Sequence, residues 1–402
     1  MRRMPAAKEP ASTKPRSRAA PTPAAEFRRA LDRAGYQQTQ LEELLGPPDA
    51  RLSTEEQRSL WRWRARSMRD HRAVLASLFL LETPVPTTAA RRALGEAGLG
   101  AAHALGLVRA RGATLEPCVQ LGLHAGLIVA GDLEFGRTLI ADRDHAGGPN
   151  TATILLDRMT VRRPVAQALD LGCGGGYLAL RLATHATAVC ATDVSPRALR
   201  LGRLNAALND LGNVQFARSD RFSALRRQTF ELITGNLPFV ISPETRFTFR
   251  DAGLRSDGFL ASVVRATGRH LVEGGLAQYL AQWVHGERDE SEAGAAREEA
   301  RLARWIHPAA CDALIIRLER EPADAYASRW LAGPGQPLSA DERTRRMTRW
   351  MAYYDRAGIR AGSTGVLCLR RRARGRHVFA IEAASPASPP SGAAIASWFD
   401  GV

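Results

Sequence analysis

The sequence predicts an α/β protein in which a mostly helical domain precedes a doubly wound sheet. Strand-like and helix-like apolar patterns alternate from residue 165 to about 285. A glycine cluster, Gly172 to Gly176, stands where the first strand gives way to the first helix. Between residues 26 and 120, apolar residues recur instead at helical spacing. Alternating strands and helices build parallel sheets with helices on both faces, so we expect a helical domain followed by an α/β domain.

The composition excludes several classes of protein. The 402 residues, 45% of them hydrophobic, suffice for two or three domains with a large core. No apolar run approaches the ~18 residues that a membrane helix needs, and the start has no apolar segment typical of a secretory signal. The five cysteines form no C-x-x-C pair, which favours a reducing compartment over disulfides or a zinc site. We therefore predict a cytoplasmic protein without a metal centre.

The charge favours a polyanionic partner but does not decide the matter. The formal net charge is +15, which suits nucleic acid. Only two of the 56 basic residues are lysines, Lys8 and Lys14, so the arginine excess also fits the codon bias of a GC-rich genome. Residues 343–376 contain eleven arginines and one acid, with aromatic residues interleaved. That stretch is either a nucleic-acid contact or a solvated helix face followed by an edge strand, and both alternatives remain open.

Composition divides the chain into four segments. Residues 1–25, rich in Pro, Ala, Ser and basic residues, predict a disordered basic tail. Residues 26–150 predict a helical, winged-helix-like domain for substrate recognition. In that domain the run from Trp61 to Arg66 interleaves tryptophans with arginines. Either these side chains stack on nucleic-acid bases, or the tryptophans lie in the core and the arginines face solvent. Residues 151–381 are the expected α/β domain, and residues 382–402 predict a loose tail.

The elements of the α/β domain follow from periodicity and from turn signals. A helix over Thr151–Met159 is expected before the first strand. Strands are expected at Val165–Leu171, Ala188–Asp193, Val214–Ala217, Phe230–Gly235 and Ala277–Leu280, with later ones at Ala313–Leu318 and Gly365–Leu369. Helices are expected at Tyr177–Ala183, Pro196–Leu208 and Phe259–Leu271.

The glycine cluster predicts a site for a nucleotide-like ligand. The stretch contains Asp170, Gly172, Cys173, Gly174 and Gly176 between a buried strand and a helix. A turn of this kind lets backbone amides approach a ligand closely. The dinucleotide fingerprint G-x-G-x-x-G would require a third glycine at the position of Tyr177. The sequence therefore disfavours a dehydrogenase.

An acid at the tip of the second strand strengthens this interpretation. Asp193 ends the expected strand 17 residues after Gly176. A carboxylate in that place accepts both ribose hydroxyls of an adenosine ligand. The structural alternative is a cap for the helix that begins at Pro196, and Ser195 fits that role better.

The most specific motif is Asn236-Leu237-Pro238-Phe239, which ends the expected fourth strand. An amide or aryl amine is a poor nucleophile because its lone pair is delocalised. The side-chain oxygen of Asn236 and the carbonyl of Leu237 can each accept one N–H bond, which aims the nitrogen at a methyl donor. Pro238 would fix the turn, and Phe239 would stack on a planar acceptor. The alternative is a simple Asn-Pro turn at a strand end.

Together these residues resemble class I S-adenosylmethionine (SAM) methyltransferases over Asp170 to about Trp283. Asp170 and the G-x-G-x-G pattern match their first motif, and Asn236 to Phe239 matches the (N/D/S)-x-P-(Y/F/W) motif of the amino-group enzymes. Similar families include release-factor glutamine, ribosomal RNA guanine-N2 and predicted bacterial methyltransferases with an added N-terminal domain. The last group also shares Thr160-Val-Arg-Arg-Pro164 and His270-Leu-Val-Glu-Gly-Gly275.

The resemblance implies a Rossmann-like, seven-stranded sheet and SAM as the cofactor. It implies that an acid at the position of Asp220 bonds the adenine amino group, although a plain turn acid is the alternative. Its cofactor set comprises Asp170, Gly172, Cys173, Gly174, Gly176, Asp193, Val194, Asp220, Arg221 and Asn236. A binding module on a degenerate fold is disfavoured because the acids and the asparagine are all present.

One departure leaves the acceptor open. Glutamine and guanine enzymes usually carry a second proline where this chain has Leu237, and Gly235-Asn-Leu-Pro-Phe-Val-Ile-Ser242 instead resembles the loop of ribosomal RNA adenine-N6 dimethyltransferases. With the positive charge, this favours an RNA base or a ribosome-associated macromolecule as the substrate. The alternatives are a protein glutamine or peptide N-terminus, and a small natural product.

Overall fold

A computed structural model describes residues 21–49, 51–52, 54–68, 70–133, 144–244, 257–286, 292–331, 338–372 and 374–402. Residues 1–20 of the expected basic tail lie outside this part of the chain. The first helix begins at Pro23, inside the expected tail, because Thr22 caps it and accepts a hydrogen bond from the Ala25 backbone N–H (3.2 Å). Over the described ranges, no helix has both the length and the hydropathy to cross a membrane.

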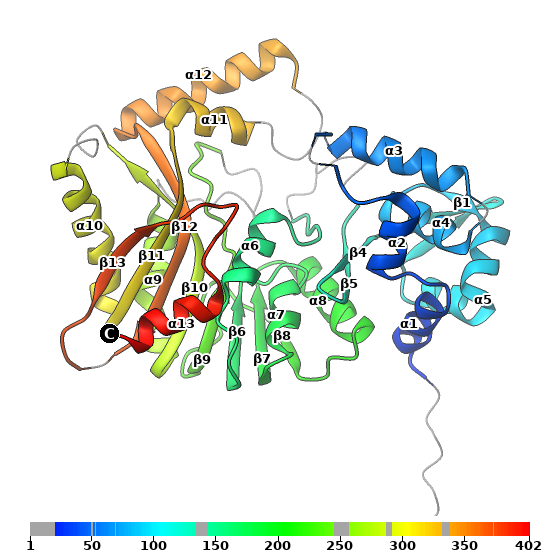
Figure 1. Ribbon diagram of the computed structural model, residues 1–402, viewed down its shortest axis with the longest axis horizontal. Helices are drawn as coiled ribbons and strands as arrows, with labels where there is room; N and C mark the ends of the chain where they lie inside the picture. Colours follow the sequence, from blue (N-terminus) through cyan, green and yellow to red (C-terminus); the bar gives the residue numbers. More distant parts are fainter. Residues whose placement is uncertain are drawn as a thin grey trace, which may run out of the picture.

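The N-terminal part is a group of short helices (Figure 1). An aromatic cluster lies in its core. The ring of Phe79 meets those of Phe27 and Tyr36 edge to face, with centroids 5.7 Å and 6.4 Å away. Trp61 packs partly against this core, whereas Trp63 is exposed. The helices are α1 (Pro23–Arg33), α2 (Gln38–Leu45), α3 (Thr54–Arg66) and α4 (His71–Leu75), with a π-helical turn at Ala76–Leu80.

A winged helix and a hairpin complete this domain. Helix α5 (Thr87–Ala104) breaks at Gly95, whose φ of 72° and ψ of 168° convert one long helix into a helix-turn-helix. A small antiparallel sheet packs beside it in the order β1, β3, β2, an arrangement that resembles the expected winged helix. The strands are β1 (Val85–Pro86), β2 (Val108–Arg111) and β3 (Thr114–Pro117), followed by the hairpin β4 (Gln120–His124) and β5 (Leu127–Gly131).

The second domain is built on one large sheet (Figure 1). Its strands are β6 (Val165–Leu171), β7 (Ala186–Asp193), β8 (Val214–Arg218), β9 (Phe230–Gly235), β10 (Leu271–His285), β11 (Cys311–Pro322), β12 (Ala361–Arg371) and β13 (Phe379–Ala383). They lie in the order β13–β11–β12–β10–β9–β6–β7–β8, and β12 runs antiparallel to both of its neighbours. Seven strands form the expected doubly wound sheet, and β13 adds an eighth beside β11.

Helices cover both faces of the sheet, as alternation predicts. On one face, α6 (Thr151–Met159), α7 (Tyr177–Leu182), α8 (Pro196–Leu208) and α13 (Gly392–Asp400) contribute to the core. On the other face, α9 (Gly258–Thr267) and α10 (Glu292–Ile306) pack through Val263, Val264 and Trp305. The expected helix over Phe259–Leu271 ends earlier than predicted, at Thr267, because a 3-10 turn over Gly268–His270 leads directly into β10.

An insert of two helices separates β11 from β12. Helices α11 (Ala323–Leu331) and α12 (Ala340–Ala357) lie at the top of Figure 1 and pack against Val240 and Ile241. The strand in the arginine-rich stretch, β12, is internal, since it pairs with β10 on one side and β11 on the other. The expectation of an edge strand there is therefore wrong, and its buried residues Val366 to Leu369 give the physical reason.

The C-terminal residues are not a loose tail. Residues 382 and 383 end β13, and α13 buries Ile395 and Phe399, which stand four residues apart on one helix face. The backbone of Gly392 lies so close to Thr160 that a Cβ atom would come 2.0 Å from its carbonyl oxygen. The domain therefore extends past the expected boundary at residue 381, because α13 packs on the same core as α6.

Removing the Phe399 ring should measure how much α13 stabilises this domain. Phe399→Ala leaves a cavity in a core where the ring is 1% exposed, so we expect a loss of about 3 kcal/mol in the free energy of unfolding. Urea denaturation followed by tryptophan fluorescence gives this value. Ser397→Ala, on the exposed side of the same helix, is the control, and equal stability of the two variants would contradict the packing of α13.

Candidate active site

The glycine loop lies between β6 and α7 and is shaped by residues in the left-handed region. Gly172, Gly174 and Gly176 have φ values of 70°, 51° and 83°, which favour glycine. A Cβ atom on Gly172 would lie 2.7 Å from Cδ2 of Leu237. The N–H of Cys173 donates to the carbonyl of Thr192 at 2.8 Å and so fastens the loop to β7. The glycines therefore serve both the turn and a close approach of the Asn236 loop.

Asp170 near the end of β6 is buried and only half satisfied. Its Oδ2 accepts the backbone N–H of Ala179 in α7 at 2.8 Å. Its Oδ1 is buried and has no hydrogen-bond partner among the described residues. Burial, followed by the repulsion of nearby Asp193, raises the pKa of Asp170 to about 7. The free protein thus holds a carboxyl oxygen that a cationic or N–H-bearing ligand would satisfy.

Asp193 at the tip of β7 lies against the same loop. Its Oδ2 accepts the N–H of Gly174 at 2.9 Å, and its Oδ1 accepts the N–H of Ser195 at 2.8 Å. Burial raises the pKa of this carboxyl above its ordinary value. Ser195 caps α8 by accepting the N–H of Ala198, so the capping role falls to the serine as expected. Val194 between them is 43% exposed.

Asp220 and Arg221 follow β8 and lie at the surface. Arg221 has a positive φ of 49°, and its Nε donates to Asp220 Oδ1 at 3.2 Å. Arg221 Nη1 also donates to Ser262 Oγ in the middle of α9. Asp220 is exposed, in contrast to the buried Asp170. The pair is the least enclosed part of the expected cofactor set.

The Asn236 loop follows β9, which lies beside β6 in the sheet. Asn236 Nδ2 donates to Thr153 Oγ1 of α6 at 2.8 Å. Its Oδ1 is buried, and the described residues offer it no partner. Leu237 is buried against the glycine loop, and the ring of Phe239 meets Trp330 of α11 edge to face at 6.2 Å. The loop therefore presents an amide oxygen that is shielded from water and free to accept a hydrogen bond.

Unpaired polar atoms gather at one edge of the sheet. Buried polar groups nearly always have partners, so exceptions need an explanation. Four buried side-chain oxygens without a partner in the described structure belong to the carboxyl ends of β6, β7 and β9, or to the residue just after β9. They are Asp170 Oδ1, Thr192 Oγ1, Thr234 Oγ1 and Asn236 Oδ1. In doubly wound sheets this edge is where ligands bind.

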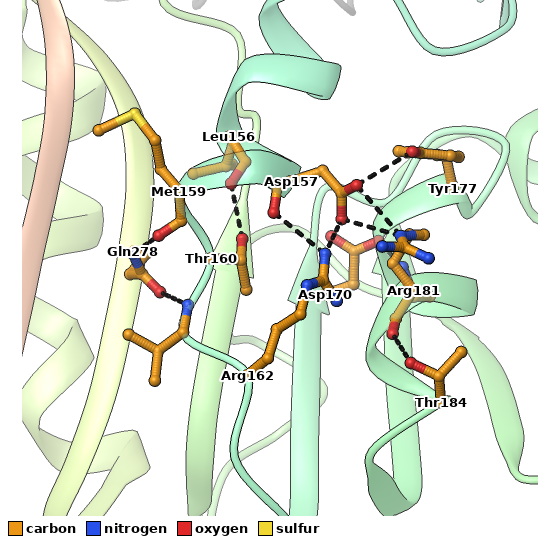
Figure 2. A network of polar contacts seen from close by, with 12 residues as sticks. Leu156, Asp157, Met159, Thr160, Arg162, Asp170, Tyr177, Arg181, Thr184 and Gln278 are labelled. Carbon is orange, nitrogen blue, oxygen red and sulfur yellow. Dashed lines mark hydrogen bonds and ion pairs between the residues drawn. The ribbon is translucent and has the colours of Figure 1, made fainter. Parts of the chain in front are cut away.

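A polar network that the sequence did not reveal holds α6 beside the glycine loop (Figure 2). Asp157 accepts a hydrogen bond from the Tyr177 hydroxyl at 3.1 Å and forms ion pairs with Arg162 and Arg181. Tyr177, which stands where the dinucleotide pattern requires its third glycine, is buried and donates its hydroxyl to Asp157 of α6. Only these long-range contacts give Asp157 its role, and no local pattern could have predicted it.

The insert of α11 and α12 holds the far end of the Asn236 loop. Ile241 donates its backbone N–H to the Tyr326 hydroxyl at 3.0 Å, and its carbonyl accepts from the Tyr354 hydroxyl at 2.7 Å. Both tyrosines are buried. The loop is therefore fixed from α6 on one side and from the insert on the other. The described residues contain no group of three or more His, Cys, Asp or Glu placed to hold a metal ion.

Two family models match the chain. Residues 148–277 match the "Methyltransferase small domain", and residues 33–117 match a "Domain of unknown function (DUF7059)". Together with the strand order and the glycine loop, the first match defines the central part as a class I SAM-dependent methyltransferase domain. The resemblance found in the sequence is thereby confirmed.

Relatives within this class include glutamine methyltransferases. The release factor glutamine methyltransferase of Escherichia coli is 29% identical over 150 residues, which are 33% of this chain and 53% of that enzyme. The enzyme of the same name from Deinococcus radiodurans is 32% identical over 190 residues, 44% of this chain and 66% of the relative. The ribosomal protein uL3 glutamine methyltransferase of Xanthomonas campestris is 32% identical over 126 residues, which are 28% of this chain and 41% of that enzyme. The chain thus spans between 41% and 66% of the length of these enzymes.

Solved structures that align with part of this chain include the YcgJ protein from Bacillus subtilis and a methyltransferase from Pyrococcus furiosus. The first aligns with a TM-score of 0.36 and 14% identity over 56% of this chain and 99% of that chain. The second aligns with a TM-score of 0.33 and 12% identity over 60% of this chain and 89% of that chain. The assignment of the fold rests on the strand order of the sheet.

The raised pKa of Asp170 predicts how SAM affinity depends on pH. The α-ammonium group of SAM favours an ionised carboxylate. With Asp170 as its expected partner, the affinity should rise roughly tenfold between pH 5.5 and pH 7 as a group with a pKa of about 7 loses its proton while the ammonium stays charged. Isothermal titration calorimetry across this range measures the dependence. In Asp170→Asn the rise should flatten, and an unchanged slope in that variant would assign the proton to another group.

Proposed function

We propose that this protein is a SAM-dependent N-methyltransferase that modifies an amide or amino nitrogen of a macromolecule. One observation carries the proposal most directly. The Asn236 amide oxygen is buried, has no partner among the described residues, and belongs to a loop that packs against the glycine turn through Leu237. A group with an N–H would satisfy that oxygen and would then lie next to the cofactor side of the sheet edge.

The residues at the sheet edge fit SAM. The unpaired Oδ1 of Asp170 suits the ammonium group of its methionine part, and Asp193 would accept the ribose hydroxyls. The loop from Gly172 through Cys173 and Gly174 to Gly176 would lie along the ligand, with Val194 against the adenine and the Asp220–Arg221 turn at its amino group. SAM supplies an electrophilic methyl group on a sulfonium, so no metal or strong base is required.

The chain's own residues would orient the nucleophile. Asn236 Oδ1 and the Leu237 carbonyl would each accept one N–H of the acceptor nitrogen, which draws its lone pair out of conjugation and toward the methyl group. Pro238 restricts the turn. Phe239, held edge to face by Trp330, would lie along a planar acceptor group. The buried Leu237 side chain excludes water between the two loops.

A glutamine side chain of a protein in the translation apparatus is the acceptor that the comparisons favour. The relatives named above are glutamine methyltransferases whose names specify release factors and ribosomal protein uL3. A primary amide has the two N–H groups that the two loop acceptors require. The departure from the usual second proline affects a residue whose carbonyl, and not its side chain, would contact the acceptor.

An RNA base is the second candidate, and the net charge of +15 favours it. The arginine-rich stretch of residues 343–376 supports RNA binding less than its eleven arginines suggest. Arg370 and Arg372 pair with the buried Asp312, and Arg371 donates to the Ala309 carbonyl. Because β12 is antiparallel, these arginines lie at the amino edge of the parallel strands, opposite the Asn236 loop. Other arginines, among them the exposed Arg349, belong to α12 in the insert that packs against Val240 and Ile241 after the Asn236 loop.

Replacing Asn236 should separate turnover from cofactor binding. Asn236→Ala removes one of the two acceptors for the substrate N–H, so we expect kcat to fall at least a hundredfold while the Kd for SAM changes less than threefold. Methyl transfer from tritiated SAM and calorimetry measure the two quantities. Gln215→Ala removes an exposed side-chain amide from β8 and serves as the control. Retained turnover in Asn236→Ala would refute the catalytic role of the loop.

The class of acceptor can be decided with cell extract. Incubation with tritiated SAM should place label in material that protease degrades and ribonuclease does not, as a glutamine acceptor requires. Label released by ribonuclease would establish the RNA alternative. In that case the KM for RNA should rise steeply with salt, since phosphate contacts release counterions, and Arg349→Ala should reduce the slope.

A further inference from the structure

A hydrogen-bonded relay connects the start of α6 to the Asn236 amide. We propose that Thr153, itself oriented by Asn150, fixes the rotation of this amide so that its oxygen faces the methyl acceptor. Thr153 and Asn150 are then positioning residues for the reaction. The inference rests on the proposed function, since it assigns a purpose to the orientation of Asn236, and it goes beyond the motifs that the sequence revealed.

The first step of the relay identifies the Asn150 oxygen. Asn150 caps α6, and its Oδ1 accepts the backbone N–H of Thr153 at 2.9 Å. A backbone N–H can only donate, so the atom facing it must be the amide oxygen and not the amide nitrogen. The same oxygen lies 3.0 Å from Thr153 Oγ1. Because that oxygen can only accept, the hydrogen bond between the two groups directs the single hydroxyl proton of Thr153 toward Asn150.

The second step fixes Asn236. With its proton committed, Thr153 Oγ1 can only accept, and the atom at 2.8 Å from it must be the donor Nδ2 of Asn236. Oδ1 then points to the other side, where it is buried and has no partner among the described residues. A flipped amide would draw the Thr153 hydroxyl proton to itself and break the bond from Thr153 to Asn150, and it would turn an N–H₂ group toward the N–H of the acceptor. Both changes would be unfavourable, so the relay selects one rotation.

Helix α6 is held firmly enough for this role. Asp157 in its last turn pairs with Arg162 and Arg181 and accepts the Tyr177 hydroxyl (Figure 2). The Gln278 side chain of β10 bonds the backbone on both sides of the helix end, at the Met159 carbonyl and the Val161 N–H, each at 2.7 Å. The hydroxyl of Thr153 is therefore placed by the same network that ties α6 to the glycine loop and to the sheet.

The orientation also bears on which groups the site accepts. An oxygen fixed toward the acceptor binds groups that present a donor, such as the N–H of a primary amide or an exocyclic amine. A group that presents only a hydrogen-bond acceptor would face Asn236 Oδ1, which is also an acceptor, so no hydrogen bond could form between them. Thr153 thus contributes to selectivity for N–H-bearing acceptors through Asn236.

The test compares Thr153→Val, which keeps the shape but removes the hydroxyl, with Thr153→Ser, which keeps the hydroxyl. The valine variant should lower kcat about tenfold, as expected for one lost hydrogen bond, with the Kd for SAM and the acceptor KM changed less than twofold. Thr153→Ser should restore most of the rate. Asn150→Asp, which remains an acceptor, should stay active. In an Asn236→Ala background the valine change should have no further effect on the residual rate.

A second readout does not depend on activity. The chain has five asparagines, so selective ¹⁵N-asparagine labelling gives five pairs of side-chain amide signals, and the pair lost in Asn236→Ala identifies Asn236. Thr153→Val should shift that pair, and Thr153→Ser should leave it near its original position.

The outcomes separate the two levels of the proposal. Full activity of Thr153→Val, or an unmoved Asn236 signal, would overturn the relay while the proposed function stands. An equal loss of rate in the valine and serine variants would also overturn it, since that result indicates a packing role. A wild-type protein that binds SAM but methylates neither protein nor RNA would refute the proposed function, and the catalytic purpose of the relay with it.

Discussion

The contact between Gly172 and Leu237 sets the geometry on which the candidate site depends. Strand β6 delivers the glycine loop and its neighbour β9 delivers the Asn236 loop, so the two turns leave the sheet side by side. A Cβ atom on Gly172 would lie 2.7 Å from the Leu237 side chain. The φ of Gly172 is 70°, a value that would strain a residue with a side chain. The glycine loop and the Asn236 loop can therefore approach this closely because Gly172 has no side chain where Leu237 is buried.

The N-terminal domain is fastened to the same loop. Asn205 of α8 bonds both the N–H and the carbonyl of Ala130 in β5, and its Nδ2 also donates to the Gly175 carbonyl. One turn later, Asn209 pairs in the same way with Ile128. The two side-chain amides thus take the place of a neighbouring strand for β5. Since the hairpin continues directly from the winged helix, that domain has a set orientation relative to the glycine loop.

Local signals predicted the elements around the site, while distant contacts account for what they missed. Strand β6, helix α8 and strand β9 begin and end at the expected residues, because alternation, a first-turn proline and a terminal glycine act within a few positions. The internal place of β12 depends on pairing with β10, some eighty residues away in the sequence. Thr153 likewise bonds a residue 83 positions later. The serines and prolines near the C-terminus led to the prediction of a loose tail, although Ile395 and Phe399 lie on one buried face of a helix.

The unpaired oxygens at the sheet edge explain why this part of the fold suits a ligand and not merely a core. A buried polar atom without a partner costs about 1–3 kcal/mol, so retaining both Asp170 Oδ1 and Asn236 Oδ1 lowers the stability of the free protein. An ionised carboxylate and an amide oxygen accept hydrogen bonds and cannot donate them. Only groups that carry N–H or O–H can satisfy both, and an ammonium-bearing cofactor beside an amide or amine acceptor has that composition. Each oxygen of the neighbouring acid, Asp193, already accepts one backbone N–H, and each can accept a further hydrogen bond, as the proposed ribose contact requires.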